Sequence, residues 1–521
     1  MSCSKVFSGN FPELIYNITK YFHNDISTLH SCILVNRTWC HSVIPLLWEN
    51  PFSTRTKDYN FIKFYLNNLN DDFKKKLNQY NIDKLLPSNT LFNYICFIRY
   101  LNIWKMISSI NIWIKGVLRI LTPINRNKSG LRKLIQTLLF KILIDNEVNL
   151  HTLDIDIFSI STYKSYYFGI FEIILQHPNF IINNVKNLNL SIGVSFRYLN
   201  HNNCDKYMLI KDFVLQIINL RSNLETITFR TESFPLYKSL LSKDYNCSNT
   251  LNTIIFFRVN LNSITNLDKV FERLNVLKSV HIIYCSSLKS SFIQQVVNLT
   301  KPFKLKTLLI EKHERLQINS LEILLQKSGA YLESFEYLNF DTNQQLIELF
   351  EKYCGNIKNL YLYISGYHII SPVLNVIENI KRNLNYLTIL LFDESIRCMR
   401  GSSTILRNLG QILPLELEYL NLILNITVSD FKIFLENIQN TFINKLLIRN
   451  TIYIDNYYDI LFCIKDYTKY NKSVRYLSFK DFIDNDLFDL KDLVKEFKLH
   501  NIIVQRYCDL YIDTLSIYKE T

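Results

Sequence analysis

A short apolar pattern recurs along the chain from about residue 150 onward, and it constrains the fold more than any other feature. The pattern is L-x-x-L-x-L, in which Ile, Val, Phe or Tyr also occupies the Leu positions. Copies begin at Leu150, Val185, Leu224, Leu251, Leu277, Leu305, Leu332, Ile357, Leu384, Leu417, Ile443, Val474 and Leu499. From Leu224 to Leu384 the copies lie 25 to 28 residues apart. Chance produces loose apolar patterns but does not maintain a period, so we predict about 13 structural repeats.

The segments between the copies have apolar residues at helical spacing instead of strand-like alternation. This holds for residues 290–299, 320–327, 344–353, 372–380, 429–438 and 490–497. A strand, a turn and a helix at a period near 26 residues resemble the leucine-rich repeat. The resemblance implies an α/β solenoid over residues 148–521, with a curved parallel sheet and outer helices, because single repeats cannot bury their own apolar face.

Alternation within each expected strand identifies candidate binding residues. In Ile357 to Tyr363, Leu360 and Leu362 are expected in the core, so the intervening side chains face the concave surface of the sheet. We predict substrate contacts from the polar and aromatic residues at such positions: His281, Asn359, Tyr361, Tyr363, Tyr386 and Tyr476. Tyr suits interfaces because it offers a large apolar area and a polar end. The alternative is a solvated face in a Tyr-rich protein.

Residues 8–50 contain three short segments with helical spacing. Pro12 suits a first helical turn, and Asp25 or Ser27 can cap the second helix. The third segment places Trp39 and Val43 on one side. Fewer than about 40 residues rarely fold alone, so we expect a partner to complete this segment.

The same segment resembles an F-box, whose pattern begins Leu-Pro-x-Glu-Leu, continues through Asp-x-x-x-Leu and ends on Val-x-x-x-Trp. The matching residues are Phe11 to Leu14, Asp25 to Leu29, and Val35 to Trp39, with Phe11 in place of the usual Leu. Pro45 to Trp48 also resembles F-boxes of fungal proteins that carry leucine-rich repeats.

This resemblance implies a substrate receptor of a Skp–cullin–F-box ubiquitin ligase, which itself performs no catalysis. The residues that would dock a Skp-type adaptor, and through it a cullin, are Phe11, Pro12, Glu13, Leu14, Ile18, Leu29, Val35 and Trp39. The repeats would hold a protein substrate. One alternative is that these apolar residues pack inside a small helical cap. Another is an interaction scaffold that never joins a ligase.

Residues 51–147 are predicted to form a basic helical connector that caps the first repeat. Residues 51–150 carry sixteen basic and six acidic residues, which accounts for most of the chain's net charge of +13. Such an excess suits an acidic partner or nucleic acid. We favour a solvated Lys-rich face, because no nucleic-acid-binding module accompanies the charge.

Composition argues against an enzyme, a cofactor or a metal site. The chain has only 10 Gly and lacks phosphate-loop, dinucleotide, zinc-protease and nucleophile-elbow motifs. Eleven Cys without a C-x-x-C pair, behind an N-terminus unlike a signal peptide, indicate the cytoplasm or nucleus. Cys32, Cys40 and His41 lack metal-ligand spacing. The most apolar stretch, 94–121, contains four basic residues, so we expect no membrane span.

Overall fold

The computed structural model describes residues 11–512, apart from 23–24, 54–58, 88, 121–127, 158–168, 183–184, 193–211, 219–222, 231–239, 241–246, 312–316, 338–343, 365–366, 392–395, 453–457 and 471–473. The chain divides into two compact units, which we describe separately. The first unit comprises Met1–Ile255 with Arg273–Leu277, and the second comprises Phe256–Glu272 with Lys278–Thr521.

The strands follow one another in the sheet in chain order, and neighbouring strands within each unit are parallel. They are β1 (Tyr100–Asn102), β2 (Thr152–Ile157), β3 (Asn187–Ile192), β4 (Thr226–Arg230), β5 (Thr253–Phe257), β6 (Ser279–Ile283), β7 (Leu305–Ile310), β8 (Ser334–Tyr337), β9 (Asn359–Ile364), β10 (Tyr386–Leu391), β11 (Glu416–Leu424), β12 (Phe442–Asn450), β13 (Val474–Lys480) and β14 (Ile503–Val504). Strands β2 to β14 overlap the thirteen copies of the apolar pattern, so the predicted α/β repeat is confirmed.

The sheet begins one strand earlier than predicted. β1 lies inside the segment interpreted as a helical connector, and it pairs with β2 so that Leu101 lies opposite Leu153. Ile98, Leu101 and Ile103 are all buried. Their spacing is a further copy of the apolar pattern, which the surrounding apolar residues conceal in the sequence.

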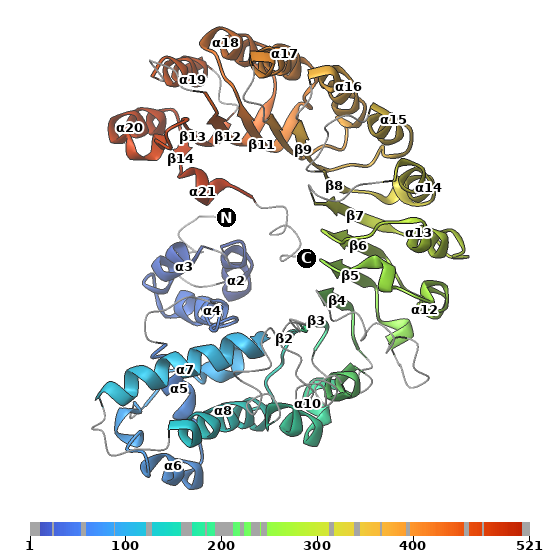
Figure 1. The fold of residues 1–521 in the computed structure, drawn as a ribbon. Helices are drawn as coiled ribbons and strands as arrows, with labels where there is room; N and C mark the ends of the chain where they lie inside the picture. Colours follow the sequence, from blue (N-terminus) through green and yellow to red (C-terminus); the bar gives the residue numbers. More distant parts are fainter. Residues whose placement is uncertain are drawn as a thin grey trace. The chain divides into compact units, whose positions relative to one another are not determined.

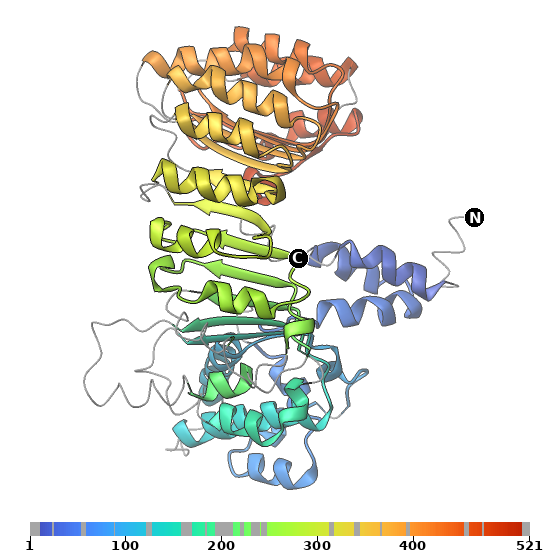
Figure 2. The ribbon, with the colours of Figure 1, turned by 90° about the vertical axis from the view of Figure 1, so that its right-hand side faces the viewer.

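Helices cover one side of the strands in the second unit (Figures 1 and 2). The helices from residue 267 onward are α12 (Leu267–Arg273), α13 (Ser290–Val297), α14 (Ile318–Ser328), α15 (Gln344–Tyr353), α16 (Ile370–Ile380), α17 (Ile396–Ile412), α18 (Val428–Asn437), α19 (Tyr458–Tyr470), α20 (Lys491–Leu499) and α21 (Tyr507–Leu510). Between the sheet and these helices lies the core, where Leu360 and Leu362 of β9 are buried as predicted. The six predicted helices correspond to α13, α14, α15, α16, α18 and α20 and are confirmed.

The first unit is helical before β1 and between the first strands. Its helices are α2 (Pro12–Lys20), α3 (Ile26–Ile33), α4 (Arg37–Leu47), α5 (Ile62–Leu66), α6 (Asp71–Asn78), α7 (Ile103–Ile120), α8 (Lys128–Asp145) and α10 (Pro178–Ile182). The side chain of Asp25 caps α3 by accepting a hydrogen bond from the Thr28 N–H, and Asn36 caps α4 in the same way. Three helices thus form where the sequence predicts them.

An aromatic cluster joins the end of α4 to the connector. The ring of Trp48 lies 4.2 Å from that of Tyr94 and 5.7 Å from that of Tyr65. Phe61 and Phe64 contact Trp48 edge-on. Because aromatic rings bury a large area in a fixed geometry, this cluster holds α4 firmly against the residues that follow it.

Candidate protein-binding face

The C-terminal residues of the second unit lie across the side of the sheet that the helices leave open. After β14 pairs with β13, the chain turns at Arg506 and forms α21 (Figure 1). We call Tyr507–Ile512 the tail. It contacts Tyr361, Tyr386, Tyr419, Asn421, Leu447 and Tyr476, which lie on β9 to β13. We call these residues, together with Ser478, which lies opposite Leu447 on β13, the tyrosine face.

Two tyrosine hydroxyls hold the backbone of Ile512. The hydroxyl of Tyr361 donates a hydrogen bond of 2.6 Å to the Ile512 carbonyl oxygen. The Ile512 N–H donates to the hydroxyl of Tyr419, at 3.3 Å. Tyr361 belongs to β9 and Tyr419 to β11, so the two hydroxyls reach the tail from strands on either side of β10. Because both contacts involve backbone atoms, they recognise a peptide without regard to the side chain at that position.

The strand register explains why these tyrosines lie together. Tyr386 of β10 is opposite Asn359 on one side and Tyr419 on the other, and the row continues through Lys445 to Tyr476. The rings of Tyr386 and Tyr419 are stacked, with centroids 6.0 Å apart. Parallel strands in register bring equal repeat positions side by side, so one motif position places three tyrosines in the same row of the sheet, with Lys445 between two of them.

Apolar packing reinforces the contact between the tail and the tyrosine face. Tyr507 and Leu510 of the tail form a buried cluster with Tyr419 and Leu447, and Ile512 packs against it. The hydroxyl of Tyr507 also donates a buried hydrogen bond of 2.8 Å to Oδ1 of Asn421. Burial raises the pKa values of Tyr361, Tyr419 and Tyr507 well above their usual range, so these hydroxyls stay protonated at neutral pH.

The tyrosine face contains polar atoms that the described part of the tail does not use. Nδ2 of Asn421 and Oγ of Ser478 are buried and have no hydrogen-bond partner among the described residues. Both side chains are fully buried. A buried polar atom without a partner is costly, so this face has unused capacity to bind a polar group.

The structure brings together three of the predicted substrate-binding residues, namely Tyr361, Tyr386 and Tyr476, which all contact or surround the tail. Tyr361 was expected to face solvent, but only 6% of it is exposed because the Ile512 backbone covers its hydroxyl. Tyr363 is partly buried on the same strand. Asn359 donates to Oγ of Ser334, at 2.7 Å.

His281 lies apart from the tyrosine face. It is on β6, and its Nδ1 is 2.9 Å from Oγ1 of Thr307 on β7. Burial lowers the pKa of His281 to about 4, and Lys306 adds to this effect although Glu333 opposes it. The imidazole is therefore neutral near pH 7 and forms a hydrogen bond within the sheet.

The sequence reasoning missed Tyr419, Asn421 and the tail. Tyr419 could have been found, because it occupies the same repeat position as Tyr386 and Tyr476, directly before the second apolar residue of the pattern. The tail follows the last repeat and has no periodic pattern, so nothing local in the sequence indicates where it binds.

The predicted adaptor-binding residues fall into two groups. Pro12, Glu13, Leu14 and Val35 are exposed, and Phe11 and Ile18 are partly buried. Leu29 and Trp39 were expected on the same docking surface, but they are only 0% and 5% exposed. Leu29 packs with Val43 and Leu46, and Trp39 is buried on α4 four residues before Val43. Leu29 and Trp39 are therefore not part of the exposed surface that an adaptor could contact.

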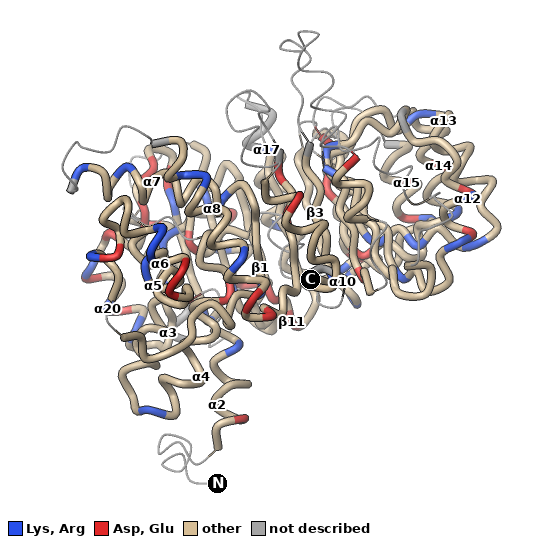
Figure 3. The backbone as a smooth tube through the Cα atoms, turned by 90° about the horizontal axis from the view of Figure 1, so that it is seen from below, with Lys and Arg blue, Asp and Glu red and all other residues tan. Residues whose placement is uncertain are grey.

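The surface of the three N-terminal helices is unusually apolar. Glu13, Lys20 and Arg37 are the charged residues of α2, α3 and α4, and Figure 3 shows how sparse charge is there. Large apolar side chains that remain exposed on these helices and the turns beside them are Leu14, Tyr16, Tyr21, Ile26, Leu34 and Val35. Apolar patches of this kind mark interaction sites in folded proteins.

The basic residues of the connector are partly engaged within the chain. The Nζ atoms of Lys76 and Lys141 lie 5.3 Å and 4.7 Å from the centroid of the Phe73 ring. Lys75 lies 3.5 Å from the Asp72 carboxylate. Arg126, another cation of this segment, lies outside the described residues. These contacts suit a solvated helical surface.

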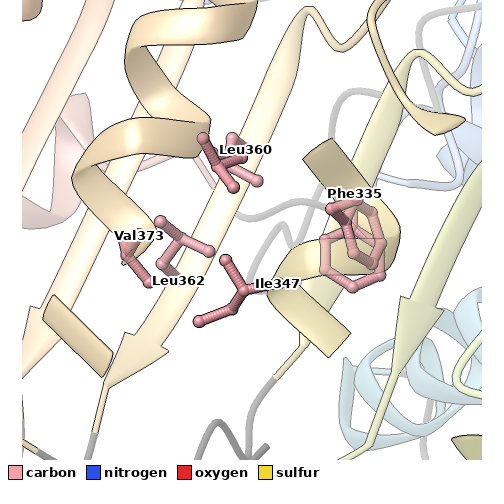
Figure 4. Close-up of a pocket in the computed structure, with 7 residues that line it drawn as sticks. Phe335, Ile347, Leu360, Leu362 and Val373 are labelled. Carbon is pink, nitrogen blue, oxygen red and sulfur yellow. The ribbon is translucent and has the colours of Figure 1, made fainter. Parts of the chain in front are cut away.

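A small cavity, of about 20 Å³, lies in the second unit between β8, β9 and the helices α15 and α16 (Figure 4). Seven apolar residues line it: Phe335, Ile347, Phe350, Leu360, Leu362, Val373 and Val376. Ligand sites usually add a few polar groups that orient the ligand, and this lining has none. We interpret the cavity as a packing gap in one repeat.

The described part of the chain includes no candidate metal site and no candidate membrane span. No group of three His, Cys, Asp or Glu side chains there could hold a metal ion. None of its helices is both long and apolar enough to cross a membrane. The cysteines that the structure describes are all free of disulfide bonds.

No family model matches the chain, and no curated protein matches it in sequence. Among solved structures, it is similar to the leucine-rich-repeat-containing protein LegL7 from Legionella pneumophila. The sequence identity is 12%, the TM-score is 0.27, and the match covers 68% of this chain and 93% of that chain. The α/β repeat architecture described above follows from the repeat period and the parallel strands of the chain itself.

Proposed function

We propose that this chain is a non-catalytic interaction protein whose tyrosine face binds a segment of a partner protein. The observation that carries this proposal is that the face already binds a peptide, the tail. Two tyrosine hydroxyls bind its backbone, and Leu447 and Tyr419 pack against its apolar side chains. Tyrosines that combine apolar area with a hydroxyl are typical of protein-binding surfaces.

We further propose that the partner is a substrate and that the chain is the receptor subunit of a Skp–cullin–F-box ubiquitin ligase in the cytoplasm or nucleus. The F-box resemblance of residues 11–39 supports this role, as do the exposed Pro12, Leu14 and Val35. Such a receptor raises the effective concentration of a substrate near the ubiquitin-transfer machinery without a chemical step of its own.

The aromatic cluster around Trp48 supports the same role. A receptor must hold its adaptor-binding helices firmly, because a loose connection lowers the effective concentration of the bound substrate. Trp48 is packed against four aromatic rings immediately after α4. Docking at α2–α4 would therefore fix the adaptor relative to the connector.

The test is a binding titration with a purified Skp-type adaptor. We expect the wild-type chain to bind, and the double variant Leu14→Asp with Val35→Asp to bind at least about tenfold more weakly, because it places charge on an apolar contact surface. Leu91→Asp is the matched control, since Leu91 is equally apolar and 91% exposed on the connector.

Equal affinity of the double variant and the wild type would remove the docking proposal. Absence of adaptor binding by the wild-type chain would leave the other reading, an interaction scaffold outside any ligase. Co-purification of a cullin with the adaptor and the chain distinguishes these two roles.

A further inference from the structure

We propose that the tail is a built-in ligand of the tyrosine face, which a partner segment of the same chemistry displaces. That segment carries an aromatic residue, an aliphatic residue three positions later and a second aliphatic residue two positions after that, as in Tyr507, Leu510 and Ile512. The inference rests on the proposed function, in which the tyrosine face binds a segment of a partner protein. It adds the kind of segment that binds.

The tail extends beyond what is needed to close the end of the repeats. Helix α20 covers the last repeat, and β14 pairs with the final long strand. The tail instead turns back over strands that are already paired on both sides, reaching Asn421 on β11 and Tyr361 on β9. A terminal cap covers the end of a repeat array, whereas this segment covers its open face.

The tail has a fixed base and a short removable part. At the base, Arg506 donates to Asp489 at 2.8 Å, and the Tyr507 N–H donates to Asp486 at 2.9 Å. Beyond the base, the described contacts are the hydrogen bonds to Asn421, Tyr361 and Tyr419 together with the apolar cluster. The tail can therefore leave the face while α20 and β14 remain in place.

The unused polar atoms of the face favour exchange. The tail competes with a partner segment for the tyrosine face, and its covalent attachment gives it a high effective concentration there. It leaves Nδ2 of Asn421 and Oγ of Ser478 without a partner among the described residues. A partner segment with a carbonyl or hydroxyl group at these points gains hydrogen bonds that the tail does not make, and this gain offsets the advantage of attachment.

The chemistry of the face selects an uncharged segment. Leu447, Asn421 and Ser478 at its centre carry no charge and are fully buried. Lys445, in the same row as the tyrosines, lies 3.8 Å from the carboxylate of Glu418. A charged residue placed over the centre would lose its hydration without a partner charge, so aromatic and aliphatic residues are preferred.

The experiment measures exchange with a fluorescein-labelled peptide that has the sequence of residues 505–516. We titrate it with the full-length wild type and with a full-length variant, Tyr507→Ala with Leu510→Ala, whose tail is loosened. We expect the variant to bind the peptide at least about tenfold more tightly. In the wild type the tail occupies the face, so the peptide binds only the small fraction of molecules whose tail has left it, and the apparent affinity is lower. Cys508→Ser, at an exposed tail position, should behave as the wild type.

Two further arms define the binding site. A peptide carrying Tyr507→Ala should not bind the loosened chain. Adding Tyr361→Phe and Tyr419→Phe to the loosened chain should weaken binding about tenfold, because both backbone hydrogen bonds are lost. Absence of peptide binding to a loosened chain that remains folded by circular dichroism would overturn the proposal, as would equal binding to the wild type.

A second measurement uses the wild-type chain alone, in case the loosened variant fails to fold. Excess unlabelled peptide should accelerate hydrogen exchange in the chain's own tail, and unchanged exchange at saturating peptide would overturn the proposal. Peptide exchange is measured at the tyrosine face and adaptor binding at α2–α4. Failure of this inference and failure of the ligase role are therefore separate results.

Discussion

The hydroxyl of Tyr361 donates a hydrogen bond to the carbonyl oxygen of Ile512, a residue 151 positions later in the chain. This contact joins the ninth strand of the sheet to the last described residue. With the Tyr419 hydroxyl on the adjacent N–H, it fixes both polar groups of one residue of the tail. The tyrosine face, which was predicted to bind a substrate, thus already binds a peptide of the chain itself.

Tyr361→Phe should loosen the tail with little effect on the rest of the fold. The substitution removes only the hydroxyl, so we expect a loss of about 1 kcal/mol in tail docking, roughly a fivefold change in the docked population. Carboxypeptidase digestion past Ile512 should accelerate accordingly. Tyr367→Phe is the control, because Tyr367 is exposed in the same repeat. Equal digestion rates in both variants would contradict the hydrogen bond.

Tyr507→Phe should have a larger effect than Tyr361→Phe. The Tyr507 hydroxyl binds Oδ1 of Asn421, whose Nδ2 has no partner among the described residues. Losing this bond leaves a buried amide without any described partner, at a cost of about 1–3 kcal/mol. Hydrogen exchange of the α21 amides should report the loss. A smaller effect than that of Tyr361→Phe would show that Asn421 finds another partner.

The sequence predicted the strands well because the repeat period determines their positions. Leu360 and Leu362 are buried and the tyrosines between and beside them lie on the opposite side, as alternation requires. β1 was missed because its pattern lies within a longer apolar stretch. Trp39 was assigned to a surface, although it is buried on α4, four residues before the buried Val43.

The tail could not be predicted by the same means. Its docking depends on side chains from β9, β11 and β12, which are far from residue 512 in the sequence. No repeat position or alternation applies beyond β14. The candidate site was therefore recognisable as a row of tyrosines, whereas its occupant became evident only from the folded chain.

His281 should make the second unit sensitive to acid. Burial lowers its pKa in the folded chain to about 4, against about 6.5 when unfolded, so the unfolded chain binds the extra proton between these values. Stability is retained above pH 6.5 and falls as the pH drops toward 4, by about 2 kcal/mol between pH 7 and pH 5. Urea unfolding at both pH values measures this loss.

The variant His281→Gln should lose most of that pH dependence, since Gln does not titrate. His368→Gln is the matched control, because His368 is exposed. A wild-type chain whose second unit unfolds at the same urea concentration at pH 5 and pH 7 would be inconsistent with a neutral, partly buried His281.

Val376→Ile should stabilise the repeat around the cavity. The added methyl group at position 376 would enter a small space lined only by apolar side chains, so we expect a gain of up to about 1 kcal/mol. Val297→Ile, on the exposed side of α13, should change little. Thermal unfolding compares the two, and a lower melting temperature for Val376→Ile would show that the cavity is already filled.

The central claim, that the tyrosine face holds a peptide, is tested most directly by the hydrogen-exchange rate of the Ile512 amide in the wild-type chain. This amide donates to the Tyr419 hydroxyl, in a segment whose apolar side chains are buried. We predict exchange at least about tenfold slower than in a free peptide of the same sequence, because the N–H is released only when the tail undocks. Exchange at the free-peptide rate would contradict the account.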